Sequence, residues 1–157
     1  MKIEQLMKRP VRTCQREDSL DGVAQVMWEG DCGCVPVVDG DGRLLAMITD
    51  RDICMAAHFQ GRPLDALKVK NAMSAIAFAC KPEDKIADAE RIMRSNQVRR
   101  LPVVDDDDRV VGIVSLNDLA LEAGVEAAAK KREVTLTEVG RTLEAVCRHR
   151  ESMVAAA

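Results

Sequence analysis

The sequence repeats itself with a period of 66 residues. Residues 1–54 align with 67–120 without a gap, and the apolar pattern agrees even where the residues differ. Apolar residues at 20, 23, 26 and 27, and again at 86, 89, 92 and 93, mark one face of a helix in each copy. Such a repeat indicates duplicated units that bury their apolar faces against each other. Thirteen aligned pairs are identical: Lys2/Lys68, Met7/Met73, Cys14/Cys80, Glu17/Glu83, Asp18/Asp84, Met27/Met93, Pro36/Pro102, Val37/Val103, Val38/Val104, Asp39/Asp105, Asp41/Asp107, Arg43/Arg109 and Asp52/Asp118.

The residue pattern of each copy predicts a strand, a helix, two further strands and a second helix, in that order. A short extended stretch, 11–14 or 76–80, leads to an acidic helix start at 17–18 or 83–84, where carboxylates suit the helix dipole. That helix ends near Gly30 or Asn96. A β-rich run (35–38 or 101–104), an Asp-rich turn and a second strand (44–48 or 110–114) follow. A second helix starts near Asp52 or Asp118, so we predict an α/β (α+β) fold built from two β-α-β-β-α repeats.

The two copies are expected to form one module. Neither copy alone is long enough to bury much core, and each has an amphipathic helix that needs a partner. Packing with approximate two-fold symmetry solves both problems, and the connector at 61–64 is short. We therefore predict repeats at 1–60 and 67–122, with a helical C-terminal extension at 123–157.

The extension lies outside the repeat. Residues 122–131 are helix-prone, and a second helix is predicted from Thr137 to about Arg150, with Thr135 or Thr137 and Glu138 as capping residues. The end of the chain, 153–157, is expected to fray. Two alternatives stay open for the extension, which either packs on its own module or bridges to a second chain.

Composition narrows the function classes. Lys and Arg number 23 against 26 Asp and Glu, a net charge of −3, which argues against a nucleic-acid-binding surface. No apolar run approaches the roughly 20 residues of a membrane span. The N-terminus is charged at once and lacks the apolar core of a signal peptide, so we expect a cytoplasmic protein.

We predict that the cysteines and the single tryptophan contribute to packing and have no reactive or binding role. Six irregularly spaced cysteines without an export signal indicate reduced thiols that pack as small apolar groups. The spacing of Cys32 and Cys34 is too tight for the usual zinc pairs. A redox disulfide between the aligned Cys14 and Cys80 is the alternative. Trp28 is expected to be partly buried, with a surface anchor for a partner as its alternative.

Neither a metal site nor a catalytic set is predicted. The acidic run 105–108 lacks the remaining spacing of a calcium loop and reads as a solvated turn. His58 and His149 lie far apart, and no Walker loop, G-x-G-x-x-G, Ser/His/Asp or Cys/His arrangement occurs. We therefore do not expect an enzyme.

The repeated pattern resembles a known family. Val-Pro-Val-Val-Asp, a turn, an apolar strand and then Thr/Ser-x-x-Asp-Ile/Leu is similar to the cystathionine-β-synthase (CBS) domain, and it occurs at 35–53 and 101–119. The resemblance covers residues 1–122. It implies a tandem CBS pair with two clefts, which often dimerises into a disc. It also implies an adenosine ligand such as AMP, ADP, ATP or S-adenosylmethionine.

Two aligned motifs are the candidate ribose sites. Thr49 with Asp52, and Ser115 with Asp118, stand where a strand ends and a helix begins, a recurrent ligand position in α/β proteins. A carboxylate there accepts two hydrogen bonds from a ribose diol, and the hydroxyl adds another. The resemblance assigns the aspartates this role. The alternative is that each aspartate only favours its helix N-terminus.

Three arginines are candidate phosphate ligands. Arg51 falls in a first helical turn, where a cation opposes the dipole unless an anion is near. The resemblance places basic residues such as Arg99 and Arg100 near phosphates. Their counterparts in the first copy are the uncharged Gly33 and Cys34, so we expect only the second repeat to supply positive charge at these positions. Exposed surface arginines are the alternative for all three.

The base side is inferred from the resemblance alone. It implies that Thr13, with backbone near Cys32 and Gly33, joins Ser115 and Asp118. Ala79, with backbone near Val98, would join Thr49 and Asp52. The first copy also has Ala46 where the second has Gly112, and a methyl there would crowd a base. We therefore expect the Asp118 cleft to be the better adenine pocket and the Asp52 cleft the better phosphate neighbour.

These observations favour a regulatory module that binds an adenosine ligand between the repeats and signals to a protein partner by a change of pose. A constitutive interaction or dimerisation scaffold with degenerate clefts is the alternative. Nucleic-acid binding through Arg99, Arg100, Lys130, Lys131 and Arg132 is a third, which the net charge disfavours.

Overall fold

The fold is the tandem-repeat α/β arrangement that the sequence predicts. The computed structural model describes residues 1–129 and 132–148. Lys130, Lys131, His149 and the predicted frayed end lie outside the described residues. The elements run in the order η1 (Ile3–Gln5), β1 (Cys14–Gln15), α1 (Leu20–Glu29), β2 (Cys34–Val38), β3 (Leu44–Thr49), α2 (Asp50–Gln60), η2 (Leu64–Ala66), η3 (Val69–Asn71), α3 (Ile86–Asn96), β4 (Arg100–Val104), β5 (Val110–Ser115), α4 (Leu116–Ala128) and α5 (Leu136–Cys147).

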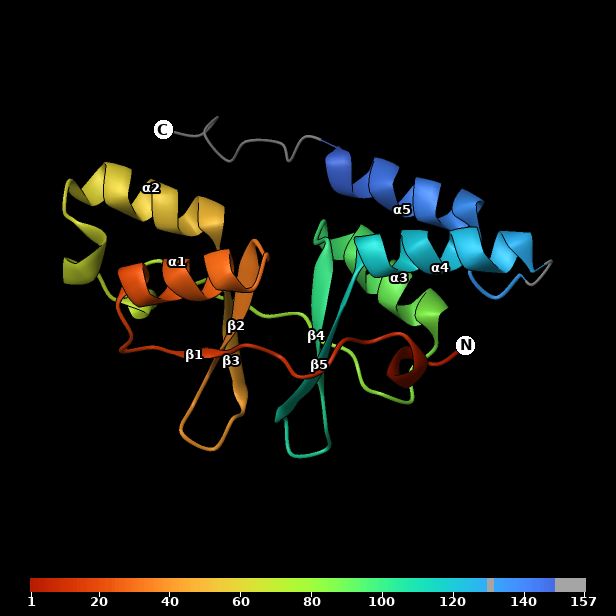
Figure 1. Cartoon of the computed structure of the whole chain (residues 1–157), viewed down its shortest axis with the longest axis horizontal. Coiled ribbons are helices and arrows are strands. Elements are labelled where there is room, and N and C mark those ends of the chain that lie inside the picture. Colours follow the sequence, from red (N-terminus) through yellow and green to blue (C-terminus); the bar gives the residue numbers. More distant parts are fainter. Residues whose placement is uncertain (130–131, 149–157) are drawn as a thin grey trace.

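Two small sheets stand side by side near the middle of the molecule, with α1 and α2 to the left of them and α3, α4 and α5 to the right (Figure 1). The first sheet has the order β1-β2-β3, with β1 parallel and β3 antiparallel to β2. The second sheet pairs β4 with β5. Cys34 pairs with Thr49 just as Arg100 pairs with Ser115, and both hairpins carry a register shift after the aligned Val37 and Val103. The internal repeat is therefore preserved in the strand register.

The lead-in strands are shorter than the predicted stretches 11–14 and 76–80. Only Cys14 and Gln15 pair with β2, and Cys80 forms a single parallel bridge with Val103. The rest of each stretch passes between the repeats instead of extending a sheet.

The helix starts also differ from the prediction. The acidic residues at 17–18 and 83–84 do not lie in a first helical turn, because α1 begins at Leu20 and α3 at Ile86. Asp18 and Asp84 instead accept backbone hydrogen bonds from Gln15 and Lys81, at 2.7 and 2.8 Å, and so stabilise the preceding turns. Ser19 caps α1 by accepting from the Gly22 amide.

The first residues of each repeat pack on the other repeat. Ile3, in η1, is fully buried in a core cluster formed otherwise by residues of the second repeat and the extension, such as Met93 and Leu119. Leu67 and Val69 are buried in the cluster of the first repeat. Backbone hydrogen bonds fix both crossings, from Ile3 to Asp84 and from Val69 to Asp18, at 2.9 and 3.0 Å. Each core is therefore completed by a segment from outside its own repeat.

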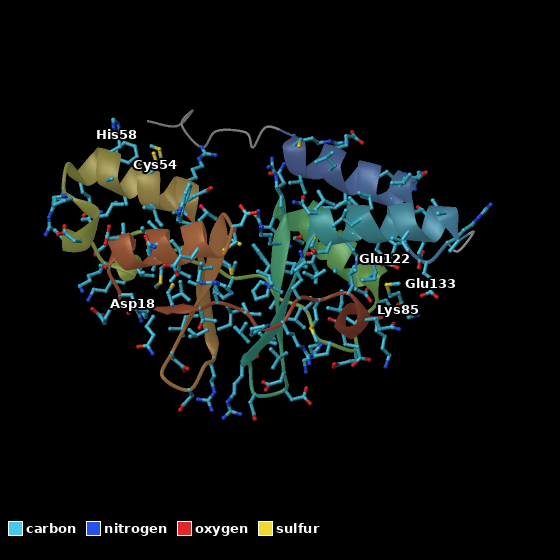
Figure 2. All side chains as sticks on the ribbon, viewed as in Figure 1. Asp18, Cys54, His58, Lys85, Glu122 and Glu133 are labelled. Atoms are coloured by element: carbon cyan, nitrogen blue, oxygen red, sulfur yellow. The ribbon has the colours of Figure 1, made fainter. Side chains whose placement is uncertain are left out.

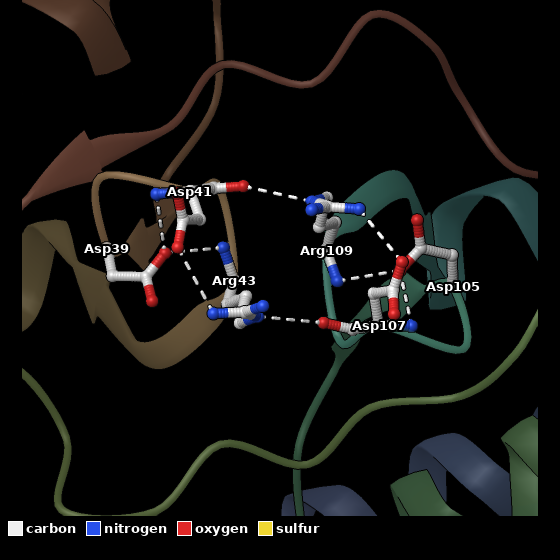
Figure 3. A network of polar contacts seen from close by, with 6 residues as sticks. All are labelled: Asp39, Asp41, Arg43, Asp105, Asp107 and Arg109. Carbon is white, nitrogen blue, oxygen red and sulfur yellow. Dashed lines mark hydrogen bonds and ion pairs between the residues drawn. The ribbon is translucent and has the colours of Figure 1, made fainter.

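The tips of the two hairpins also join the repeats (Figure 3). Arg43 Nε donates to the carbonyl of Asp107 and Arg109 Nε to that of Asp41, both at 3.2 Å. Each arginine also pairs with an aspartate of its own turn, Asp41 or Asp107. The aligned Arg43 and Arg109 therefore make reciprocal contacts across the pseudo-two-fold axis.

The described part of the extension packs on its own module, as the first of its two alternatives expects. The predicted helix at 122–131 is the continuation of α4, which runs unbroken across the predicted boundary at 122/123. The second tail helix is α5, with Thr135 as its N-cap. It packs against α3 and α4, and the Arg94 guanidinium on α3 donates to Thr142 Oγ1 at 3.0 Å.

Trp28 is 84% exposed on α1, so the expectation of partial burial is wrong. Its aligned residue Arg94 lies under α5, whereas no described helix covers Trp28.

The exchanged lead-in gives a stability prediction. Ile3→Ala removes a fully buried side chain from the core of the second repeat, and we expect a loss of about 2–5 kcal/mol in the free energy of unfolding. Ile76→Ala is the control, because Ile76 is 66% exposed and should change stability by less than about 0.5 kcal/mol. Urea unfolding followed by circular dichroism measures both, and equal effects would contradict the exchanged packing.

Candidate functional site

Both candidate aspartates take part in a capping box at the start of a helix. Thr49 and Ser115 are the N-caps of α2 and α4, and each hydroxyl accepts from the backbone amide of the aspartate three residues on. In return, Asp52 Oδ2 and Asp118 Oδ2 accept from the N-cap amide, at 2.9 and 2.8 Å. Capping thus uses one carboxylate oxygen of each aspartate and leaves Oδ1 for other partners.

A cavity of about 270 Å³ lies between the repeats beside Asp118. The first repeat contributes residues from 8–12 and 30–36, and the second contributes Arg100, Ile113, Ser115, Asn117 and Asp118. Of the residues predicted from sequence, the fold brings together Cys32, Arg100, Ser115 and Asp118. A molecule in this cavity would touch both halves of the module.

The carboxylate of Asp118 is buried but its second oxygen is unsatisfied. The residue is 4% exposed, and within the described residues Asp118 Oδ1 accepts no hydrogen bond of acceptable geometry. Its neighbour is the Lys8 ammonium, 2.9 Å away, on a side chain that is 69% exposed. Since a carboxylate oxygen can accept more than one hydrogen bond, this oxygen is suited to accept from a ligand hydroxyl beside the Lys8 ammonium.

Three cationic side chains line the same cavity: Lys8, Arg12 and Arg100. Backbone bonds between Lys8 and Ile113 hold the main chain of Lys8 against β5, at 2.8 and 3.2 Å. Lys8 and Arg12 were not predicted, although the basic run from Lys8 to Arg12 is visible in the sequence. Because the lead-in crosses to the other repeat, these charges reach a cavity that the repeat pattern alone does not assign to them.

The other predicted phosphate ligands lie elsewhere. Arg99 is exposed, and its guanidinium lies 4.0 Å from Cys147 Sγ on α5. Arg51 is exposed and lines neither this cavity nor the groove described below.

The motif of the first repeat has a different setting. Thr49 and Asp52 are half-buried, and neither lines the Asp118 cavity. A second hollow, the α1–α2 groove, has a volume of about 620 Å³ and lies between those helices. Asp50 and Gly33 line it, and the Asp50 amide donates to the Gly33 carbonyl at 3.2 Å. The two copies therefore present different surfaces around the same motif.

Of the predicted base-side residues, Cys32 lines both hollows and Gly33 lines the α1–α2 groove, whereas the other three line neither. Thr13 is exposed and does not line the Asp118 cavity, although the neighbouring Val11 and Arg12 do. Ala79 and Val98 are half-buried and line neither hollow. A methyl at Gly112 would collide with Met7, so the lead-in side chain occupies the space over this glycine.

A family model described as the CBS domain matches residues 3–58 and again residues 69–123. The chain belongs to the CBS domain family. The paired match agrees with the two repeats seen in the strand register. Among the described residues, no helix combines the length and apolar character needed to cross a bilayer.

One relative of similar length is itself a CBS protein. The CBS domain-containing protein YhcV of Bacillus subtilis is 35% identical over 119 residues, which cover 76% of this chain and 83% of YhcV. A homoserine O-acetyltransferase of Methanosalsum zhilinae is 29% identical over 117 residues, 74% of this chain, yet the match spans only 23% of the enzyme. The likeness to that enzyme is therefore confined to a CBS-sized part of it.

Solved CBS structures share the fold. Hypoxic Response Protein I, solved with two coordinated zinc ions, has a TM-score of 0.70 and 29% identity over 77% of this chain and 98% of its own. The CBS domain pair of MJ0100, in complex with 5′-methylthioadenosine and S-adenosyl-L-methionine, has a TM-score of 0.71 at 23% identity. That match covers 80% of this chain and 98% of the MJ0100 chain. Among the described residues here, no cluster of three or more His, Cys, Asp or Glu is arranged to hold a metal ion.

The six cysteines are all free thiols in settings of unequal reactivity. Burial, with a smaller effect of the neighbouring Asp18 or Asp84, raises the pKa of Cys14 and of Cys80 to about 12. Burial also raises the pKa of Cys34 to about 11, against an opposing effect of Arg100. Cys14 and Cys80 lie in different core clusters, as apolar fillers.

This inequality predicts an order of alkylation. At pH 8 we expect iodoacetamide to modify the exposed Cys54 and Cys147 first, because the thiolate is the reacting form and the buried thiols keep their protons. Figure 2 shows Cys54 on the outer side of α2. Peptide mass spectrometry over time checks the order, and early modification of Cys14 or Cys80 would contradict it.

Proposed function

We propose that this CBS pair is a regulatory module that binds an adenosine-containing ligand in the Asp118 cavity. The observation that carries the proposal is the buried Asp118 carboxylate beside a cavity between the repeats, whose Oδ1 has the Lys8 ammonium as an ion-pair partner but accepts no hydrogen bond of acceptable geometry. A ribose diol donates the hydrogen bonds that this oxygen lacks. Ser115 keeps the carboxylate oriented, since its hydroxyl and amide both bond Oδ2.

The charges around the cavity favour a ligand that carries phosphate. Lys8, Arg12 and Arg100 supply up to three cations, and guanidinium groups bind phosphate oxygens in pairs. AMP, ADP or ATP therefore suits the cavity better than S-adenosylmethionine, whose sulfonium is positive. The MJ0100 complex is an example of the same fold with adenosine compounds, and the preference for phosphate rests on the residues of this chain alone.

Ligand binding would change how the two repeats are arranged relative to each other. The cavity draws its lining from both repeats, so a ligand there favours the arrangement in which the two sides are correctly spaced. A partner protein that distinguishes the two arrangements would then respond to the ligand, provided that the ligand binds one of them more tightly.

Asp118→Asn tests the ribose contact. The asparagine side chain keeps one oxygen that accepts from the Ser115 backbone N–H, but its NH₂ group takes the place of the second carboxylate oxygen. Because that group donates instead of accepting, we expect AMP affinity to fall at least about tenfold, which equals 1.4 kcal/mol. Asp52→Asn is a matched control because it changes the equivalent capping box outside the cavity. Isothermal titration calorimetry with AMP, ATP and S-adenosylmethionine measures both variants.

A wild-type protein that binds none of these compounds, or an Asp118→Asn variant that binds as tightly as the wild type, would contradict the proposal. The scaffold alternative, in which both clefts are degenerate, predicts that outcome.

Arg100→Gln tests the phosphate contact. Arg100 lines the cavity and its neighbour Arg99 does not, so the two arginines form a natural pair of variants. We expect Arg100→Gln to weaken ATP binding about tenfold while leaving adenosine binding unchanged, and Arg99→Gln to change neither. Competition titrations check this, and an equal loss for adenosine and ATP would show that Arg100 does not face the phosphates.

A further inference from the structure

The α1–α2 groove has a counterpart in the second repeat that is filled by a helix. Met27 and Ala57 line the groove, and 66 positions later Met93 and Ala123 lie in the buried cluster to which α5 contributes Val139. There α5 packs against both α3 and α4, the helices that correspond to α1 and α2. The second repeat therefore shows that a helix fits the hollow between such a pair.

The residues that hold α5 in place are replaced in the first repeat. Arg94 donates to Thr142 on α5 at 3.0 Å, and the Gln97 side-chain amide donates to a carbonyl of its last turn at 3.2 Å. The aligned residues of the first repeat are Trp28 and Asp31. An ionised carboxylate accepts hydrogen bonds and cannot donate them. A helix in the α1–α2 groove therefore needs an apolar side chain at Trp28 and a hydrogen-bond donor at Asp31.

The groove is apolar along its length and exposes large side chains. Ala24, Ile53 and Leu64 line it, besides Met27 and Trp28. Trp28 is 84% exposed. An exposed tryptophan beside an open apolar hollow is typical of a binding surface for another protein.

The polar end of the groove is acidic. Asp31 precedes β2 and Asp50 follows β3, so both lie where this hairpin meets the helices. Both line the groove, and neither forms an ion pair within residues 1–129 and 132–148. Lysine or arginine side chains of a bound helix would pair with these two carboxylates.

The groove of a second copy is a poor occupant for the same reasons. Two such hollows placed face to face are both concave, so neither fills the other. They would also bring two copies of Asp31 and of Asp50 together, and like charges at an interface are unfavourable. The occupant is therefore expected to be a convex, basic helix.

We propose that the α1–α2 groove binds an amphipathic helix of a partner protein. Its apolar face contacts Trp28, and its lysine or arginine side chains pair with Asp31 and Asp50. The partner helix takes the place in the first repeat that α5 takes in the second. This docking does not require a ligand in the Asp118 cavity, so it is tested independently of the proposed ligand.

A modified copy of α5 is a suitable probe, because α5 covers the aligned surface. The probe is a synthetic peptide of residues 132–148 with Thr142→Leu and Ala145→Lys, the positions that contact the counterparts of Trp28 and Asp31. The control peptide carries Thr142→Leu and Ala145→Glu. Trp28 is the only tryptophan, so a blue shift of its emission reports burial of the groove. We expect the lysine peptide to bind at least about tenfold more tightly than the glutamate peptide.

Asp31→Asn tests the charge pairing. Asp31 has a φ of 45°, and asparagine tolerates this left-handed conformation, so the fold is retained. We expect the variant to lose most of the preference for the lysine peptide. Asp21→Asn is the matched control, because Asp21 is exposed on the same helix but does not line the groove. It should keep the full preference.

Ala57→Gln tests the hollow itself. Glutamine is compatible with a helix and fills the space that the peptide would occupy, so we expect affinity for the lysine peptide to fall more than about tenfold. Ala87→Gln, at an exposed position of α3 outside the groove, should leave affinity unchanged. Thermal unfolding by circular dichroism establishes that both variants are folded.

Three results would overturn the proposal. The first is a lysine peptide that does not bind the wild type. The second is binding that is insensitive to Ala57→Gln or equal for the lysine and glutamate peptides. The third is a wild-type protein whose Trp28 is already buried by self-association in sedimentation velocity and which excludes the peptide, because the groove would then belong to a second copy.

Discussion

The structure depends on the burial of each lead-in segment in the core of the other repeat. Ile3 completes the core around Met93 and Leu119, and Leu67 and Val69 complete the other core. A unit this small buries too little surface alone, and the crossing supplies the missing apolar area to both repeats at once. The crossing also carries Lys8 and Arg12 past the opposite repeat, so the same packing that stabilises the fold builds the charged wall of the Asp118 cavity.

The two repeats share their hairpin register and capping motif but differ in the side chains around them. Both repeats have the same register, the same capping box and the same hairpin contact. They differ where Arg100 replaces Cys34 and where Arg94 replaces Trp28. The first difference adds a cation to the cavity lining, and the second gives α3 a hydrogen bond to Thr142 on α5. Different side chains on a shared hairpin and capping arrangement therefore give the two repeats different surfaces.

Several parts of the site were beyond prediction for identifiable reasons. The pairing of Ser115 with Asp118 follows from the repeat, because a capping box is local and its spacing is visible. The contribution of Lys8 is not visible, because it depends on a crossing of more than 100 residues in sequence separation to Asp118. The exposure of Trp28 was also missed, because an amphipathic pattern indicates an apolar face but not whether another helix covers it.

The sequence by itself determined the duplicated unit, the order of its strands and helices, the turns and the capping motifs, since all of these rest on contacts between residues close in the chain. Only the tertiary structure decided which lead-in belongs to which core, which cations reach Asp118, and that α5 covers α3 and α4 while α1 and α2 stay open. Those choices are made by contacts between distant segments, whose free energy depends on shape and burial that a periodic pattern does not encode.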